Sequence, residues 1–175
     1  GLDATHMGIE LTANAQPIKK LDIRGMLSIG DWRWNADVDA TIINEDNSTT
    51  NIVIDLKDVH VGNSAQTTAA LGVDYEVLPK VKIGVDYNYY DNLFADFDIT
   101  KREESIDSWE MPNYSLIDIN TKYSFKIGKV DATLIGNINN LLDTEYIADA
   151  KDGSLHDAST ALVYYGFGRT YSLSL

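Results

Sequence analysis

Apolar and polar residues alternate along most of this chain. Successive side chains of a β-strand point to opposite faces of its sheet, so the alternation predicts strands that have one apolar and one polar face. It is clearest in 80–93, where Val81 and Ile83 are set against Lys82 and Asp86. Seven segments with this pattern are predicted as strands: 7–15, 21–33, 67–77, 80–93, 114–126, 129–139 and 162–175. The pattern therefore predicts an all-β, antiparallel protein.

Short turns and long polar segments join the predicted strands alternately. The short turns contain Pro17, Pro79 and Gly128. The long segments cover 35–66, 95–113 and 140–161. Short turns at one end and long loops at the other are typical of an up-and-down barrel in an outer membrane. Strand-like alternation continues within about 35–66, which predicts an extracellular hairpin there.

Strand length separates a membrane barrel from a soluble sandwich, since both show alternating strands. A tilted membrane strand needs about 9–11 residues, whereas strands of globular proteins have a mode of about 5–6. The predicted strands are long enough to be membrane strands. The hydrophobic content of 44% would suit a soluble protein, but barrel strands are only half apolar. The alternation and the strand lengths together favour a transmembrane β-barrel.

Three sequence elements in the last third of the chain carry a family resemblance. They comprise Pro112, Tyr114 and Asp118, then Asn140, Leu141, Asp143 and Tyr146, then Arg169 and Tyr171. In these residues and their order the chain resembles the C-terminal end of TonB-dependent outer-membrane receptors. Leu142 departs from the family pattern, because an aromatic is usual there. The family normally ends on an aromatic a few residues beyond the position of Leu175, so a few further residues are expected.

The resemblance implies a receptor that imports a scarce ligand, such as a siderophore, cobalamin, a glycan or a peptide, with energy from TonB. Barrels of this family have 22 strands around a plug. Residues 1–175 are therefore expected to be the C-terminal segment of such a barrel, a partial wall without the plug. The implied partners are outer-membrane lipid and lipopolysaccharide, the remaining barrel and plug, TonB through the missing N-terminal region, and a surface lipoprotein. The C-terminus is expected in the periplasm.

Two other interpretations stay open at this point. The chain could form a complete eight-stranded barrel with a structural or adhesive role, using 36–60 as extra strands. It could also be a soluble β-rich binding module. Pairing between the first strand, 7–15, and the last, 163–175, would favour the complete barrel. A partial wall predicts instead that both of these strands lie at open edges.

The alternation also assigns the faces of the predicted wall. The lipid-facing residues are expected to include Ile83, Val85, Tyr87, Ile117, Ile119, Leu134 and Leu173. The lumen-facing residues are expected to include Asp86, Asn88, Asp118, Asn120 and Asp131. Arg169 is expected at the outer membrane surface, facing lipopolysaccharide phosphates.

Acidic residues gather in the three long segments, which contain 17 acids and 4 bases, whereas the rest of the chain contains 10 of each. This argues against nucleic acid as a partner. Because divalent cations prefer oxygen ligands, the acids suggest a speculative cation site. Its candidate ligands are Asp96, Asp98, Glu103, Glu104 and Asp107. No catalytic motif, cofactor motif or cysteine is present in the sequence, so neither an enzyme nor a cofactor is expected.

Overall fold

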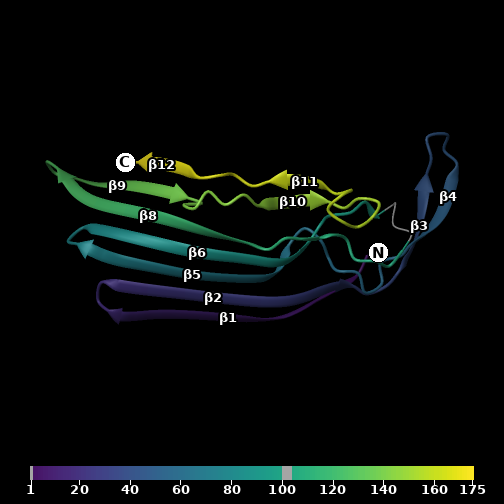
Figure 1. The fold of residues 1–175 in the computed structure, drawn as a ribbon, viewed down its shortest axis with the longest axis horizontal. Helices are drawn as coiled ribbons and strands as arrows, with labels where there is room; N and C mark the ends of the chain where they lie inside the picture. Colours follow the sequence, from purple (N-terminus) through teal and green to yellow (C-terminus); the bar gives the residue numbers. More distant parts are fainter. Residues whose placement is uncertain (1, 100–103) are drawn as a thin grey trace.

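The computed structural model describes residues 2–99 and 104–175 and shows an all-β chain dominated by one antiparallel sheet. Its main strands are β1 Ala4–Ile18, β2 Leu21–Trp34, β5 Ala65–Leu78, β6 Val81–Phe94, β8 Tyr114–Ile127, β9 Val130–Asn139 and the short β12 Thr170–Ser174. They lie side by side in the order β1-β2-β5-β6-β8-β9-β12 (Figure 1). The two-residue strand β7, Glu110–Met111, pairs with the end of β6. The predicted all-β antiparallel fold is confirmed.

The last predicted strand, 162–175, is in fact two strands in two sheets. Strand β11, Leu162–Tyr165, pairs with β10, Ile147–Lys151, whereas β12 pairs with β9. Between β11 and β12 the chain passes close to the ring of Tyr146, and a Cβ atom on Gly166 would lie only 2.0 Å from it. The prediction of one continuous strand was wrong because the alternation of side chains does not show where a strand changes its partner.

Strands β1 and β12 form the two edges of the main sheet, and each pairs on one side only. Within residues 2–99 and 104–175 they do not pair with each other, so this part of the chain does not close a barrel. Strands β3, Val38–Ile43, and β4, Thr49–Ile54, form a separate two-stranded sheet rather than additional wall strands. The eight-stranded interpretation is therefore wrong, and the open wall agrees with a partial barrel.

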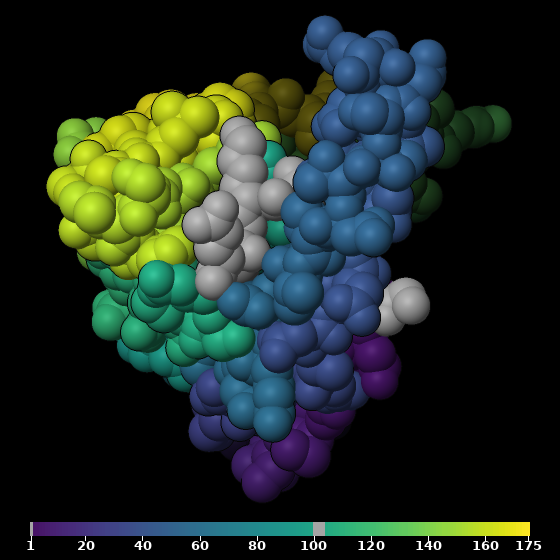
Figure 2. All heavy atoms as spheres, turned by 90° about the vertical axis from the view of Figure 1, so that its right-hand side faces the viewer, coloured from purple at the N-terminus to yellow at the C-terminus, as the bar shows by residue number. Residues whose placement is uncertain are grey.

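The hairpin of β3 and β4 projects from the end of the sheet that carries the long loops (Figures 1 and 2). Its base is held by Asp37, whose Oδ1 accepts hydrogen bonds from the backbone N–H groups of Leu56 and Lys57, each at 2.9 Å. Leu56 and the nearby Val59 are buried. One carboxylate thus closes the base of the hairpin, and backbone hydrogen bonds of Trp34 with Val59 and Asp58, each at 2.9 Å, join the base to β2.

The base of this hairpin is expected to loosen in acid. The Lys57 and Leu56 N–H groups hold the pKa of the Asp37 carboxyl below its usual value. The stabilisation is therefore fully present above the ordinary aspartate pKa, and it is lost as the pH falls through the lowered pKa of the folded state. Amide-exchange protection of Leu56 and Lys57, corrected for intrinsic exchange, should fall over that range. In Asp37→Asn the amide oxygen accepts without titrating, so protection that still falls in this variant would contradict the assignment.

The register separates the two faces of the wall as the alternation predicted. Residues directly opposite each other in an antiparallel pair share a face. Asp86 lies opposite Asp118, and the adjacent Tyr87 lies opposite Ile117. Asn120 donates from Nδ2 to Asp86 Oδ2 at 3.2 Å. Ile117 and Asp118 therefore lie on opposite faces, and polar side chains contact one another along the polar face.

A small core lies where the long loops pack on the ends of the strands. Ala95 donates its backbone N–H to Trp109 O and Asp96 donates to Ala150 O, each at 2.9 Å, and the Ser108 hydroxyl donates to Ala95 O at 2.7 Å. The core side chains there are those of Leu93, Ala95, Met111 and Ala150. The segments 95–113 and 140–161, expected to be separate loops, are thus packed together.

No helix in the described ranges is long and apolar enough to cross a membrane.

Candidate functional site

The residues that carry the family resemblance meet at one junction, where β9 ends and the chain turns toward β10. Asp118, on the polar face of β8, accepts the backbone N–H of Asn140 through Oδ1 at 2.8 Å. Leu141 donates its N–H to Ile117 O at 2.7 Å. The side chain of Asp118, in the first sequence element, is therefore hydrogen-bonded to the backbone of Asn140, in the second. We call this cluster, formed by Asp118, Asn140, Asp143 and Arg169, the motif junction.

Asn140 is the centre of the motif junction. Its side chain is buried, with 4% of the residue exposed, and its φ is 51°, a left-handed value that asparagine adopts more readily than most residues. Asn140 Oδ1 accepts the N–H of Thr144 at 2.8 Å, while Nδ2 donates to Thr144 O at 2.9 Å and to Phe167 O at 3.2 Å. The side-chain amide of Asn140 therefore joins the second sequence element to Phe167, which lies just before the third element.

Asp143 and Arg169 complete the junction. Asp143 Oδ1 accepts the backbone N–H of Arg169 at 2.7 Å. The Arg169 guanidinium donates to Leu141 O at 3.1 Å and lies 3.9 Å from Asp143 Oδ2. Its expected position facing lipopolysaccharide phosphates stays a prediction, and within the chain it contacts Leu141 and Asp143. Its charge is set beside a carbonyl and a carboxylate that order the turn.

Aromatic rings link the remaining motif residues. Tyr114 stacks on Tyr90 of β6 with ring centroids 4.9 Å apart, and Tyr146 lies against Tyr114 at 4.4 Å. Tyr171 of β12 pairs with Ile138 of β9. Pro112 directly precedes β8, and Leu142, at the departure from the family pattern, is 67% exposed.

A charged ladder crosses the polar face in the middle of the wall. Arg24 of β2 forms ion pairs with Asp74 of β5 and with Asp86 of β6, the latter at 3.2 Å. Gly72 leaves room for it, because a Cβ there would lie 2.7 Å from Asp86 Oδ1. With Asn120 the ladder spans four neighbouring strands. This face thus carries charged and amide groups, whereas the opposite face carries apolar side chains such as Val73, Val85 and Ile119 at the neighbouring positions.

Among the described residues, those proposed to bind a divalent cation do not form a cluster. Asp98 and Glu104 line a groove of about 900 Å³ together with Asp152. Asp107 is instead bound to His60, through the backbone N–H at 2.7 Å and Nδ1 at 2.8 Å. No set of three or more metal-binding side chains is placed to hold an ion in the ranges that the structure describes, and Glu103 lies outside those ranges.

The cation site therefore stays a prediction. Calcium titration of the full-length protein checks it, because an ion bound by these carboxylates would raise the thermal stability and protect 95–113 from proteases. If calcium changes neither property, the acids are simply solvated.

Some residues that organise the loop end carry no signal in the sequence. His60 stacks on Phe94 with ring centroids 4.1 Å apart in addition to binding Asp107. Gln66 is buried, accepts the Trp32 N–H through Oε1 at 2.8 Å and donates to Val61 O at 3.2 Å. Their partners lie in other loops or strands, so neither spacing nor alternation indicates them.

Comparison with known proteins identifies the family to which this chain belongs. The sequence profile of the family described as "TonB dependent receptor-like, beta-barrel" matches residues 3–141, most of the chain, and the chain belongs to this family. Family membership implies the bacterial outer membrane and a transport receptor rather than an enzyme family. A search of curated proteins found no match.

Among solved structures, the chain is similar to one titled "Structure of the FpvAI-pyocin S2 complex", with a TM-score of 0.60 and 14% identity. The similarity covers 98% of this chain and 20% of the other, so the chain spans about a fifth of the length of that protein. At this identity the likeness concerns the fold alone. It agrees with the open, partial wall seen here.

Proposed function

We propose that this chain is the C-terminal wall segment of a TonB-dependent receptor that imports a scarce ligand across the outer membrane. The family match over residues 3–141 carries the proposal. The two-faced sheet supports it, since an apolar face suits lipid and a polar face suits a wet interior. The ligand belongs to the class of siderophores, cobalamin, glycans or peptides, and transport draws on TonB, contacted through the N-terminal region of the receptor.

The proposed orientation follows from the lengths of the connections. Short turns face the periplasm and long loops the exterior, as in outer-membrane barrels, which puts the C-terminus in the periplasm. The free edges of β1 and β12 pair with further strands of the barrel, because unpaired backbone groups are strongly unfavourable in lipid. Residues of the polar face then surround the plug.

Uptake by cells tests the proposed function. A strain lacking the whole receptor gene, and the same strain carrying it again, are given radiolabelled ferric siderophores, cobalamin, oligosaccharides and peptides in separate experiments. Uptake of one class should depend on the receptor and on TonB. The proposal fails if uptake of every class is unchanged in the deletion strain, or if the full-length protein is recovered from the soluble fraction.

A further inference from the structure

Three lysines lie within the strands of the main sheet, and the register gives two of them an acidic neighbour. Lys82 of β6 lies directly opposite Glu76 of β5, and its Nζ atom is 4.0 Å from Asp22 Oδ2. Lys126 of β8 lies directly opposite Asp131 of β9, with 3.3 Å between Nζ and Oδ1. The positive charge of each of these two lysines is therefore offset within the wall.

The third lysine, Lys122 of β8, has no such neighbour. It lies directly opposite Lys82 on one side and Ile135 on the other. The other positions around it on the paired strands carry no charge: Gly84, Asn120, Ser124, Thr133 and Asn137. Within residues 2–99 and 104–175, the ion pairs all involve other residues. The register therefore leaves the charge of Lys122 without a counter-charge in this part of the wall.

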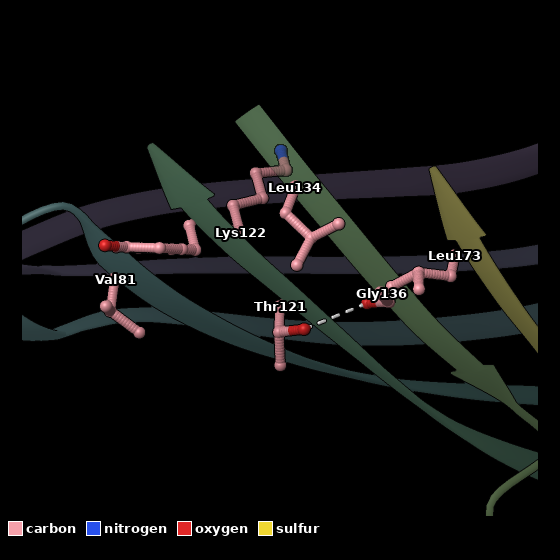
Figure 3. A pocket seen from close by; sticks show the side chains of 7 residues that line it. Val81, Thr121, Lys122, Leu134, Gly136 and Leu173 are labelled. Atoms are coloured by element: carbon pink, nitrogen blue, oxygen red, sulfur yellow. Dashed lines mark hydrogen bonds between the residues drawn. The ribbon is translucent and has the colours of Figure 1, made fainter. Parts of the chain in front are cut away.

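Lys122 belongs to the polar face of the wall. Figure 3 shows its side chain extending away from Thr121, which lies on the apolar face and donates its hydroxyl to Gly136 O at 3.2 Å. Lys122 is exposed in the open wall. Under the proposed function the polar face lines the lumen, and the lumen of a 22-stranded transporter is occupied by a plug. The ammonium group of Lys122 is then directed toward the plug.

The surroundings of Lys122 define what a partner must supply. Like charges directly opposite each other in an antiparallel pair are destabilising, so an anion relieves the repulsion between Lys82 and Lys122. A charge removed from water without a partner also costs free energy, so a plug packed here has to offer an acceptor. Ile135 adds an apolar side chain to the same row, between Lys122 and Ser174. A protein surface with a carboxylate can cover the isoleucine and neutralise the lysine, whereas a free ion does only the second.

We propose that Lys122 forms an ion pair with an aspartate or glutamate of the plug, and that this contact holds the plug against β8 and β9. The proposal rests on the proposed function, because only the wall of a plugged barrel has this partner on its polar face. An ion pair shielded from water between wall and plug is stronger than one on an open surface.

Carbodiimide coupling of the full-length receptor in lipid vesicles tests this contact. The reagent condenses a lysine amine and a carboxylate that touches it into an amide, and mass spectrometry of the digested protein identifies both residues. Lys122 should be joined to an acidic residue of the plug. Lys126 should be joined to Asp131, and because this pair lies on the same face, its product shows that the reagent reached the lumen.

Three variants make the test specific. Lys122→Gln should abolish the plug-linked product, whereas Lys126→Gln, the matched control on the same strand, should leave it unchanged. Lys122→Glu should abolish the product as well. Exchanging the coupled plug acid for lysine in the Lys122→Glu protein should restore it, because the amine and the carboxylate have then changed places.

The plug contact is overturned if Lys122 stays uncoupled while Lys126 and Asp131 are joined, since its ammonium group is then simply hydrated. Coupling of Lys122 to a carboxylate of another barrel strand would also overturn it. Failure of the proposed function looks different: receptor that does not float with the vesicles in a density gradient is not inserted in a membrane, and that result rejects the membrane-wall assignment itself.

Discussion

Replacing Asn140 by alanine is expected to destabilise the motif junction by about 3 kcal/mol. The amide of Asn140 makes three hydrogen bonds to backbone groups of Thr144 and Phe167 from a buried position, and leaving buried groups unpaired costs ~1–3 kcal/mol each, reduced where water enters. Alanine must also adopt the left-handed φ of 51°, which adds ~1 kcal/mol. Urea unfolding of the full-length receptor in vesicles measures the change, and amide exchange at Thr144 localises it.

Two matched variants separate the causes. Asn139→Ala removes an exposed amide that donates to Thr170 Oγ1, so it should cost less than ~1 kcal/mol. Asn140→Gly lacks the amide but accepts the positive φ, so it should be about 1 kcal/mol less harmful than Asn140→Ala. If Asn140→Ala is no worse than Asn139→Ala, the amide does not hold the junction together.

Placing a charge on the apolar face of β6 should destabilise the wall far more than placing it on the polar face. Val85 lies between Val73 and Ile119 on neighbouring strands. Val85→Arg should cost about 2–4 kcal/mol near the middle of a bilayer, because the guanidinium has no water there. Three residues along the same strand, Asn88→Arg puts the same charge on the opposite face, and it should change the free energy of unfolding by less than about 1 kcal/mol.

Reversible urea unfolding of the receptor in lipid vesicles compares the two arginine variants. Equal destabilisation would mean that both faces meet water, as in a soluble sheet. A larger effect at Asn88 than at Val85 would mean that the faces are reversed.

Alternation in the sequence determined the long strands and the separation of the faces. Val81–Phe94 and Tyr114–Ile127 were recognisable because side chains of one strand alternate whatever it pairs with. The same local rule underlies the correct assignment of Ile117 and Asp118 to opposite faces. The open edges of the wall were expected from the family resemblance instead, because a partial wall of a larger barrel leaves its first and last strands without their outer neighbours.

Tertiary structure decided what depends on contacts between distant residues. Strand alternation cannot show that 162–165 pairs with 147–151 while 170–174 pairs with 130–139, since a change of partner leaves the side-chain pattern intact. The motif residues were visible as separate elements, but their meeting around Asn140 depends on a turn with positive φ and on carbonyls far along the chain. His60 and Asp107 show the same limit, because the bond between them exists only once two long loops have packed together.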